Sequence, residues 1–395
     1  MGISNKVNDA MQQGSWIRKM FEEGIELKQK YGAENVFDLS IGNPVMSPPK
    51  QFFSELKKIA ESPTEGMHRY MPNAGLTNTR ASVAAQKSVE TGLDFSYEDI
   101  IMTCGAAGAL NVVLKSILDP GDEIVIFSPF FVDYEFYTSN HGGKCKIVPP
   151  DGNFLPDMDA LRASIGEKTR GVLINSPNNP SGAVYSSDVL SEITNIILDK
   201  ENEFGTEIFL INDEPYRKII FDDKHFPDIF KHHKRTIVAT SHSKDLALPG
   251  ERIGYIAVNP NCNNKEQLMG ALVFCNRVLG FINAPALMQH IVANLQATTV
   301  DVAEYQQKRD FLYSALVNMG YDLVKPQAAF YMFPKSPIKD DVEFVGLLKK
   351  HKVLTVPGVG FGLEGFFRIS YCLEDDTLTG SLPGLEAAIN EAISQ

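Results

Sequence analysis

A lysine, a carboxylate, a phenol and an amide stand out because each lies within a few residues of the end of a short apolar run of the chain. They are Lys244, Asp213, Tyr216 and Asn179. A lysine amine can attack a carbonyl group and then move protons. A carboxylate can pair with a protonated ring nitrogen, and a phenol and an amide can hydrogen-bond to a ring oxygen. These residue types indicate covalent chemistry on a nitrogen heterocycle that carries a carbonyl group.

A second set of residues is suited to a phosphate group. It combines backbone amides at an expected helix start with two hydroxyls and a guanidinium: Gly105, Ala106, Ala107, Ser241, Ser243 and Arg252. Free N–H groups at a helix N-terminus bind phosphate, and hydroxyls and a guanidinium fork add to that site. Phe131 offers a flat face for a ring, with Phe130 as its rival. Phosphate, ring nitrogen, ring oxygen and aldehyde together describe pyridoxal 5′-phosphate.

These residues need a scaffold that brings the ends of separate strands together. Seven short apolar runs lie at residues 100–103, 124–127, 145–148, 171–174, 208–211, 236–241 and 253–258. They are continuous rather than alternating, as expected for strands buried on both faces, and helical patterns separate most of them. This predicts an α/β fold with a seven-stranded, mainly parallel sheet, helices on both faces and a ligand site at the carboxyl ends of the strands. The last two runs are too close for a helical crossover, so the final strand is predicted to be antiparallel.

The regular alternation of apolar runs and helical patterns ends near residue 290. A long helical pattern spans residues 285–318, short strand signals follow at 329–333, 353–356 and 366–371, and a closing helix is expected at 379–394. We therefore expect a smaller α+β domain after the large one. The predicted division is an N-terminal segment, 1–48, that joins the small domain, a large cofactor-binding domain, 49–290, and a small C-terminal domain, 291–395.

Composition excludes several classes of protein. The 395 residues include 37 Lys+Arg and 49 Asp+Glu, for a formal net charge of −12. An acidic chain disfavours nucleic acid and anionic membrane as partners. The 5 cysteines are scattered without a CxxC pair, which disfavours a metal site and indicates a reducing compartment. We find neither an apolar run of membrane-spanning length nor a signal peptide, so we expect a cytoplasmic protein.

Several segments, in family order, resemble the class I/II aminotransferases among the fold-type I pyridoxal-phosphate-dependent enzymes, the aspartate aminotransferase-like group. The matching segments are Gly42-Asn43-Pro44, Tyr70 with Gly75, Asn178-Asn179-Pro180-Ser181-Gly182, Asp213-Glu214-Pro215-Tyr216, Ser241-His242-Ser243-Lys244 through Pro249-Gly250-Glu251-Arg252-Ile253-Gly254, and Phe367-Arg368-Ile369-Ser370. The resemblance covers residues 36–390. One departure is Gly105, where many relatives carry a hydroxyl.

The resemblance implies a role for each matching residue. Lys244 would be the Schiff-base lysine and the base that moves the substrate proton, Asp213 would hold the ring nitrogen, and Tyr216 and Asn179 would hold the ring oxygen. Phe131 would stack on the ring, and the phosphate would lie among the second set of residues above. Arg368 would clamp the substrate α-carboxylate, a task for which lysine is less suited. Gly42, Asn179 and Arg277 complete the implied substrate contacts, and Tyr70 would reach the phosphate of a neighbouring subunit, which implies a homodimer with shared active sites.

The predicted function is transamination by a ping-pong mechanism. An L-amino acid, aspartate or one similarly small, would give its amino group to a 2-oxo acid such as 2-oxoglutarate. A C–S lyase or an aminocyclopropane-carboxylate synthase-like enzyme is an alternative, since the same residues serve those reactions. A non-catalytic effector-binding module of a transcription regulator is a third, which would need an added DNA-binding domain; only about 35 residues precede the matching region. Residues 360–365 match GxGxxG, but a strand rather than a helix is expected after them, so we reject a dinucleotide site.

Overall fold

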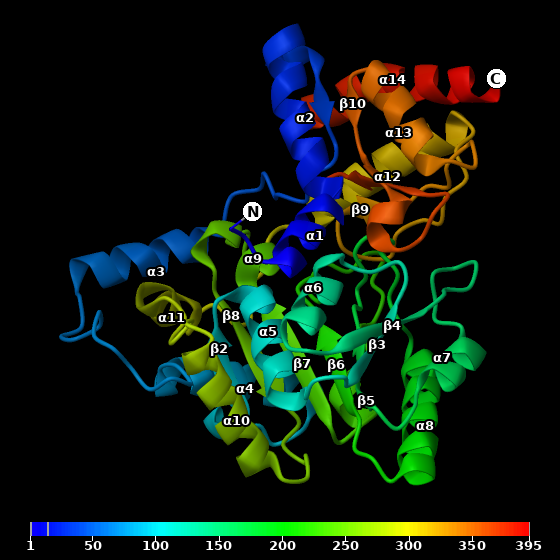
Figure 1. The fold of residues 1–395 in the computed structure, drawn as a ribbon. Coiled ribbons are helices and arrows are strands. Elements are labelled where there is room, and N and C mark those ends of the chain that lie inside the picture. Colours follow the sequence, from blue (N-terminus) through cyan, green and yellow to red (C-terminus); the bar gives the residue numbers. More distant parts are fainter. Residues whose placement is uncertain (1, 14–15, 395) are drawn as a thin grey trace.

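A central sheet dominates the computed structural model, which describes residues 2–13 and 16–394 (Figure 1). Within these residues seven strands pair in the order β2-β8-β7-β6-β5-β3-β4. Their bounds are β2 Ile100–Thr103, β3 Glu123–Phe127, β4 Lys144–Val148, β5 Thr169–Ile174, β6 Phe209–Asp213, β7 Thr236–Ser241 and β8 Gly254–Val258. β8 runs antiparallel to both β2 and β7, and the other neighbouring pairs are parallel. The predicted mainly parallel α/β sheet and its antiparallel last strand are confirmed.

Helices cover both faces of this sheet, because side chains of successive strand residues point to opposite faces and both sets are apolar. One face packs against α4 (Thr77–Thr91), α7 (Met158–Ser164), α8 (Ser187–Phe204) and α11 (Ala286–Val292). The other packs against α5 (Gly105–Ile117), α6 (Asp133–Asn140) and α10 (Lys265–Val278). The helix α3 (Lys50–Glu61) lies beside α11.

β4 does not fit the prediction of strands buried on both faces. It is one of the two edge strands, and three of its five residues, Lys144, Lys146 and Ile147, are exposed. The prediction treated residues 145–148 as a buried run and did not use the lysines at 144 and 146, which are the sign of an edge that this sequence carries. Two lysines on the strand are typical of a protected edge.

A smaller group of elements lies above the large sheet in Figure 1. A three-stranded antiparallel sheet joins β11 (Val356–Pro357), β12 (Phe367–Ser370) and β9 (Tyr331–Met332) in that order. It packs with α12 (Val302–Asn318), α13 (Asp341–Lys350) and α14 (Asp375–Ile393). Near the N-terminus, α1 (Asn5–Gln13) and α2 (Trp16–Tyr31) precede β1 (Phe37–Asp38), which pairs in parallel with β10 (Val353–Leu354). The boundaries predicted at residues 48/49 and 290/291 stay predictions.

The single helix predicted over residues 285–318 is wrong, because α11 and α12 are separate. The backbone between them is used for contacts with the large sheet: Val300 N–H donates to the Asp245 carbonyl at 2.8 Å, and Lys218 Nζ donates to the Thr298 carbonyl at 3.0 Å. Asp301 then caps α12 by accepting a hydrogen bond from Ala303 N–H at 3.0 Å. The run predicted at 353–356 is likewise divided between two sheets.

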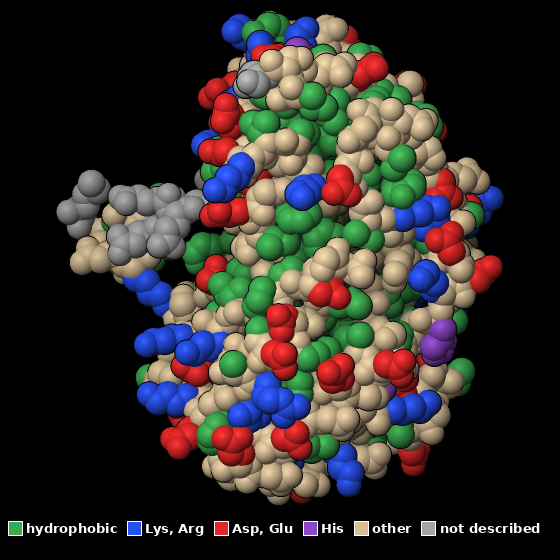
Figure 2. All heavy atoms as spheres, turned by 90° about the vertical axis from the view of Figure 1, so that its right-hand side faces the viewer, with side chains coloured by type: hydrophobic (Ala, Val, Ile, Leu, Met, Phe, Trp, Pro, Cys, Tyr) green, Lys and Arg blue, Asp and Glu red, His purple; other side chains and the backbone are tan. Residues whose placement is uncertain are grey.

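The surface carries charges of both signs. On the face drawn in Figure 2, hydrophobic side chains gather along the middle, and acidic and basic side chains are scattered around them. Among the described residues, no helix combines the length and apolar character that a membrane crossing requires.

Candidate active site

One cavity of about 280 Å³ lies where both groups of elements meet. Its wall includes residues that follow β2, β3, β5, β6 and β7, together with residues of β9 and β12. This is the expected place for a ligand in such a sheet, at the carboxyl ends of the strands. Most sequence-predicted residues line it: Gly42, Ala106, Ala107, Phe131, Asn179, Asp213, Tyr216, Ser241, Ser243, Lys244, Arg252 and Arg368. Gly105, Tyr70 and Arg277 are not part of its wall.

Lys244 lies on the short helix α9 (His242–Asp245), directly after β7. Its Nζ donates a hydrogen bond to the Gly42 carbonyl at 2.8 Å and lies 5.3 Å from the centre of the Phe330 ring. Burial, and to a smaller degree the positive charges of Arg368 and Arg252, lowers the pKa of Lys244 to about 8. A substantial fraction of this amine is therefore neutral, and so nucleophilic, close to physiological pH.

Asp213 ends β6 and is almost completely buried. Its Oδ2 accepts a hydrogen bond from the Tyr134 hydroxyl at 2.6 Å, whereas its Oδ1 has no hydrogen-bond partner among the described residues. Burial raises the pKa of Asp213 to about 7. A buried carboxylate oxygen without a partner is costly. Here it belongs to a residue of the cavity wall, so it is suited to a ligand that brings a proton donor.

Backbone amides, two hydroxyls and one guanidinium line the cavity in a combination suited to an anion. Ala106 and Ala107 lie in the first turn of the 13-residue helix α5, where backbone N–H groups lack partners within the helix. Ser241, Ser243 and Arg252 line the same cavity. Gly105 supports these groups from behind: its φ is +72°, and a Cβ atom there would lie 2.9 Å from a guanidinium nitrogen of Arg252. Only glycine suits that position, so Gly105 shapes the site without lining it.

Arg368 lies on β12, so it reaches the cavity from the smaller group of elements. Its guanidinium lies 4.6 Å from the centre of the Tyr331 ring and 4.8 Å from that of Phe361. It donates hydrogen bonds to Asn179 Oδ1 at 3.1 Å and to the Ser40 carbonyl, and its Nε has no partner among the described residues. A buried, oriented guanidinium with unused donor capacity is suited to a carboxylate.

Tyr331 is a residue of the cavity wall that the sequence analysis missed. Its hydroxyl hydrogen-bonds with the Tyr216 hydroxyl at 3.1 Å, and a Cβ atom at position 42 would overlap it, so Gly42 makes room for this tyrosine. Tyr331 lies within the strand signal at 329–333. Nothing in the sequence showed that its side chain would meet Tyr216 of the large domain's segment after β6. Asn175 follows the apolar run at 171–174 directly, but the sequence analysis gave it no role; its Oδ1 accepts a hydrogen bond from Asn179 N–H at 2.7 Å and its Nδ2 donates to the Asp213 carbonyl at 2.8 Å.

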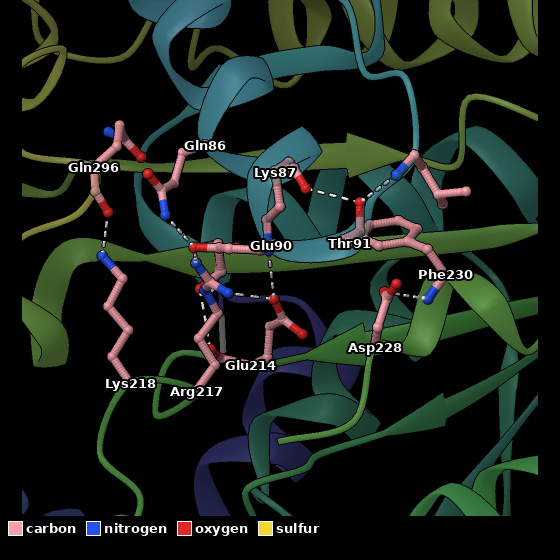
Figure 3. A network of polar contacts seen from close by, with 12 residues as sticks. Gln86, Lys87, Glu90, Thr91, Glu214, Arg217, Lys218, Asp228, Phe230 and Gln296 are labelled. Carbon is pink, nitrogen blue, oxygen red and sulfur yellow. Dashed lines mark hydrogen bonds and ion pairs between the residues drawn. The ribbon is translucent and has the colours of Figure 1, made fainter. Parts of the chain in front are cut away.

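A buried ionic network supports the segment that carries Asp213 and Tyr216 (Figure 3). Lys87 of α4 pairs with Glu214 at 3.1 Å, and both side chains are almost inaccessible. Arg217 pairs with Glu90 at 2.7 Å, and Glu214 also accepts a hydrogen bond from Asn212 Nδ2 at 2.8 Å. These contacts fix both ends of the turn between Asp213 and Arg217 against α4.

Of the other predicted residues, Phe131 lies in the cavity wall, and Tyr70 and Arg277 lie on the surface. Phe131 lines the cavity, whereas its rival Phe130 is buried in the core beside α5 and α6. Tyr70 is 91% exposed and shares a surface groove with Phe281 and Ile282. Arg277 is exposed on α10, next to the ring of Phe274. Within this chain, neither Tyr70 nor Arg277 lines the cavity.

Comparisons with known proteins agree with this geometry. The sequence profile of the family described as "Aminotransferase class I and II" matches residues 34–381. A probable aspartate aminotransferase of Methanocaldococcus jannaschii is 33% identical over 353 residues, 87% of this chain and 91% of the relative. The aspartate aminotransferase of Pyrococcus horikoshii is 31% identical over 95% of this chain and 94% of its own. The crystal structure of an aminotransferase from Eubacterium rectale is similar with a TM-score of 0.95 and 36% identity, covering 99% of both chains.

Proposed function

The chain belongs to the class I and II aminotransferases, and from that premise we propose that it moves the amino group of L-aspartate to 2-oxoglutarate with pyridoxal 5′-phosphate as cofactor. Family members typically use this cofactor. The relatives from Methanocaldococcus jannaschii and Pyrococcus horikoshii are named as a probable aspartate aminotransferase and an aspartate aminotransferase. The observation that carries the proposal is a single cavity holding the Lys244 amine, the Asp213 carboxylate and the Arg368 guanidinium.

The charges of the cavity fit this cofactor. Its described wall contains three cations, Lys244, Arg252 and Arg368, and one carboxylate, Asp213, although the whole chain is acidic. A phosphate at one end and a substrate carboxylate at the other would use two of these cations. The partnerless Oδ1 of Asp213 would accept a hydrogen bond from a protonated ring nitrogen.

The residues that would hold the cofactor follow from their positions. The amides of Ala106 and Ala107, the hydroxyls of Ser241 and Ser243, and Arg252 would bind the phosphate. Phe131 would cover the ring, and Tyr216 and Asn179 would hydrogen-bond to its oxygen. When bound, pyridoxal phosphate supplies an aldehyde that takes up the amino group and a ring that withdraws electrons from the substrate Cα.

The chain's own residues would then orient the substrate and move its proton. Arg368 would fix the α-carboxylate and, with it, the direction of the Cα–H bond. Lys244 would take the proton from the substrate Cα, pass it on to the bound cofactor, and carry it back to Cα in the reverse half-reaction, which its lowered pKa favours. Asp213 would keep the ring nitrogen protonated throughout.

Specificity for aspartate needs a further cation. Within the described cavity wall, Arg252 and Arg368 are committed to the phosphate and the α-carboxylate, so a side-chain carboxylate would need a group from outside this wall. We assign that role to Arg277 of a second subunit. Arg277→Ala should raise the KM for aspartate and glutamate about tenfold and leave that for alanine unchanged. Equal effects on all three substrates would contradict this role.

We also propose a homodimer with shared sites, which the exposed side chains near Tyr70 support. Tyr70, Phe274, Val278 and Ile282 are all exposed, and Tyr70 and Ile282 border the same groove. Large apolar side chains gathered on a surface mark an interaction site. Tyr70 would reach the phosphate end of the neighbouring subunit's cavity from this face.

Transfer of labelled nitrogen tests the proposed reaction. The reconstituted protein is incubated with ¹⁵N-labelled L-aspartate and 2-oxoglutarate, and the products are followed by NMR. We expect the label in glutamate, together with parallel lines in double-reciprocal plots, as ping-pong kinetics require. Label released as ammonia would indicate elimination instead, and no turnover with any amino acid would contradict the proposal.

A further inference from the structure

Tyr134 lies behind the cavity wall rather than in it. It belongs to α6 and is 1% exposed. Its hydroxyl donates the 2.6 Å hydrogen bond to Asp213 Oδ2. Its backbone N–H donates to the Phe131 carbonyl at 3.1 Å, and the two rings meet edge to face, with centres 5.7 Å apart. One residue therefore contacts both the carboxylate and the aromatic wall of the site.

The other contacts around Asp213 show why the hydrogen bond from Tyr134 matters. Among the described residues, Asp213 forms no ion pair, and the Tyr134 hydroxyl is the one group that donates a hydrogen bond to its carboxylate. The neighbouring Glu214 points its carboxylate at Lys87 and Asn212 instead. Tyr137 of α6 and Tyr216 also face this region, and their hydroxyls bond to Asp133 and Tyr331.

We propose that Tyr134 is a positioning residue for the cofactor: it donates its hydrogen bond to Oδ2 of Asp213, favours the ionised carboxylate, and so leaves Oδ1 free to accept a hydrogen bond from the protonated ring nitrogen. The inference rests on the proposed function, because it concerns how the same site holds its cofactor. Tyr134, which is not part of the cavity wall, would thus influence the protonation and orientation of the Asp213 carboxylate, which is.

The inference predicts that the effect of Tyr134 on cofactor binding depends on pH, because it acts through the ionisation of Asp213. Burial raises the pKa of Asp213, and the hydrogen bond from Tyr134 opposes this rise by stabilising the ionised form. Removal of the hydroxyl should therefore raise that pKa further. At acid and neutral pH a larger share of Asp213 would then be protonated and unable to hold a protonated ring nitrogen. At alkaline pH both proteins would have an ionised Asp213, and the difference would shrink.

The test compares wild type, Tyr134→Phe and Tyr321→Phe as apoproteins. Tyr321 is a matched control, because it is also buried and its hydroxyl also donates one hydrogen bond, at 2.9 Å, to the Leu385 carbonyl away from the cavity. Binding of pyridoxal phosphate is measured by absorbance titration between about pH 6 and pH 9. We expect Tyr134→Phe to bind roughly 10-fold or more weakly near pH 6, with the ratio to wild type falling toward about one near pH 9.

A second readout does not require cofactor. In apoprotein labelled with ¹³C at the aspartate carboxyl, NMR titration should show the Asp213 pKa raised by about one unit or more in Tyr134→Phe and unchanged in Tyr321→Phe. A binding ratio that is constant with pH, or an unchanged Asp213 titration, would overturn the inference. Wild-type protein that fails to bind pyridoxal phosphate would overturn the proposed function, and the NMR titration would still decide the effect of Tyr134 on Asp213.

Discussion

Burial changes what the Lys244 amine can do. An ordinary lysine is charged at neutral pH, but in this cavity desolvation and two nearby arginines favour the neutral form. Because the pKa of Lys244 is lowered, its amine is mostly neutral above about pH 8 in the folded protein. A surface lysine would still be protonated at that pH.

Competitive labelling of the apoprotein with acetic anhydride checks this value. The reactivity of Lys244, quantified by mass spectrometry, should rise with pH and level off above about pH 8, whereas surface lysines gain reactivity up to about pH 10. A Lys244 profile that keeps rising with the surface lysines would show that burial has not shifted this amine.

Arg368→Lys tests the proposed carboxylate clamp. Lysine keeps the charge but lacks the planar fork, so kcat/KM should fall about 10- to 100-fold for both the amino acid and the 2-oxo acid. Steady-state kinetics measure the loss, and cofactor affinity should stay unchanged as an internal control. Unaltered kcat/KM values would place the carboxylate elsewhere.

Residue types and their place after apolar runs predicted most of the side chains that the large sheet contributes to the cavity, whereas Gly42 and Arg368 came from the family resemblance. Asn175 was within reach of the same rule, because it follows the run at 171–174 directly. Tyr331 and Tyr134 could not be found in this way, because their importance depends on contacts across more than 30 residues of sequence. Tyr331 meets Tyr216 through a sheet on the other side of the cavity, and Tyr134 reaches Asp213 from a helix two strands away. The roles of all these residues stay predictions until the variants are measured.

At the scale of elements, the strands of the large sheet were predictable because they are apolar on both faces. The same signal could not show that β4 is an edge strand, or that the helical pattern over 285–318 breaks into α11 and α12. In both cases a tertiary arrangement, strand order or a backbone contact with Asp245, overrides the local pattern.

The attachment of the Asp213–Arg217 turn to α4 is an element-scale prediction. Lys87→Met would remove the nearer cation of the buried Glu214 and leave only Arg217 Nε, at 3.8 Å, so it should destabilise the apoprotein by about 3 kcal/mol and lower its Tm by several degrees. Lys146→Met, which breaks an exposed pair with Glu123, is the control and should cost less than about 1 kcal/mol. Thermal unfolding followed by circular dichroism measures both; equal effects would rule out a special role for the Lys87–Glu214 pair.

At the scale of the whole molecule, the proposed dimer predicts complementation between two impaired variants. Lys244→Ala and Tyr70→Ala are unfolded, mixed and refolded together. If Tyr70 acts across the interface, each mixed dimer contains one site with both residues intact, so activity should return to about a quarter of the wild-type value. Sedimentation checks the assembly. A mixture no more active than its two parents would mean that Tyr70 does not serve a neighbouring site.

The visible absorption spectrum during a single half-reaction tests the central claim most directly, namely that Lys244 and its cavity carry out pyridoxal-phosphate-dependent transamination. The reconstituted wild-type protein should show the absorption band of cofactor held by Lys244, lose it when L-aspartate alone is added, and regain it with 2-oxoglutarate. Lys244→Ala should lack this band. A wild-type band that no L-amino acid changes, or an identical band in Lys244→Ala, would contradict the account.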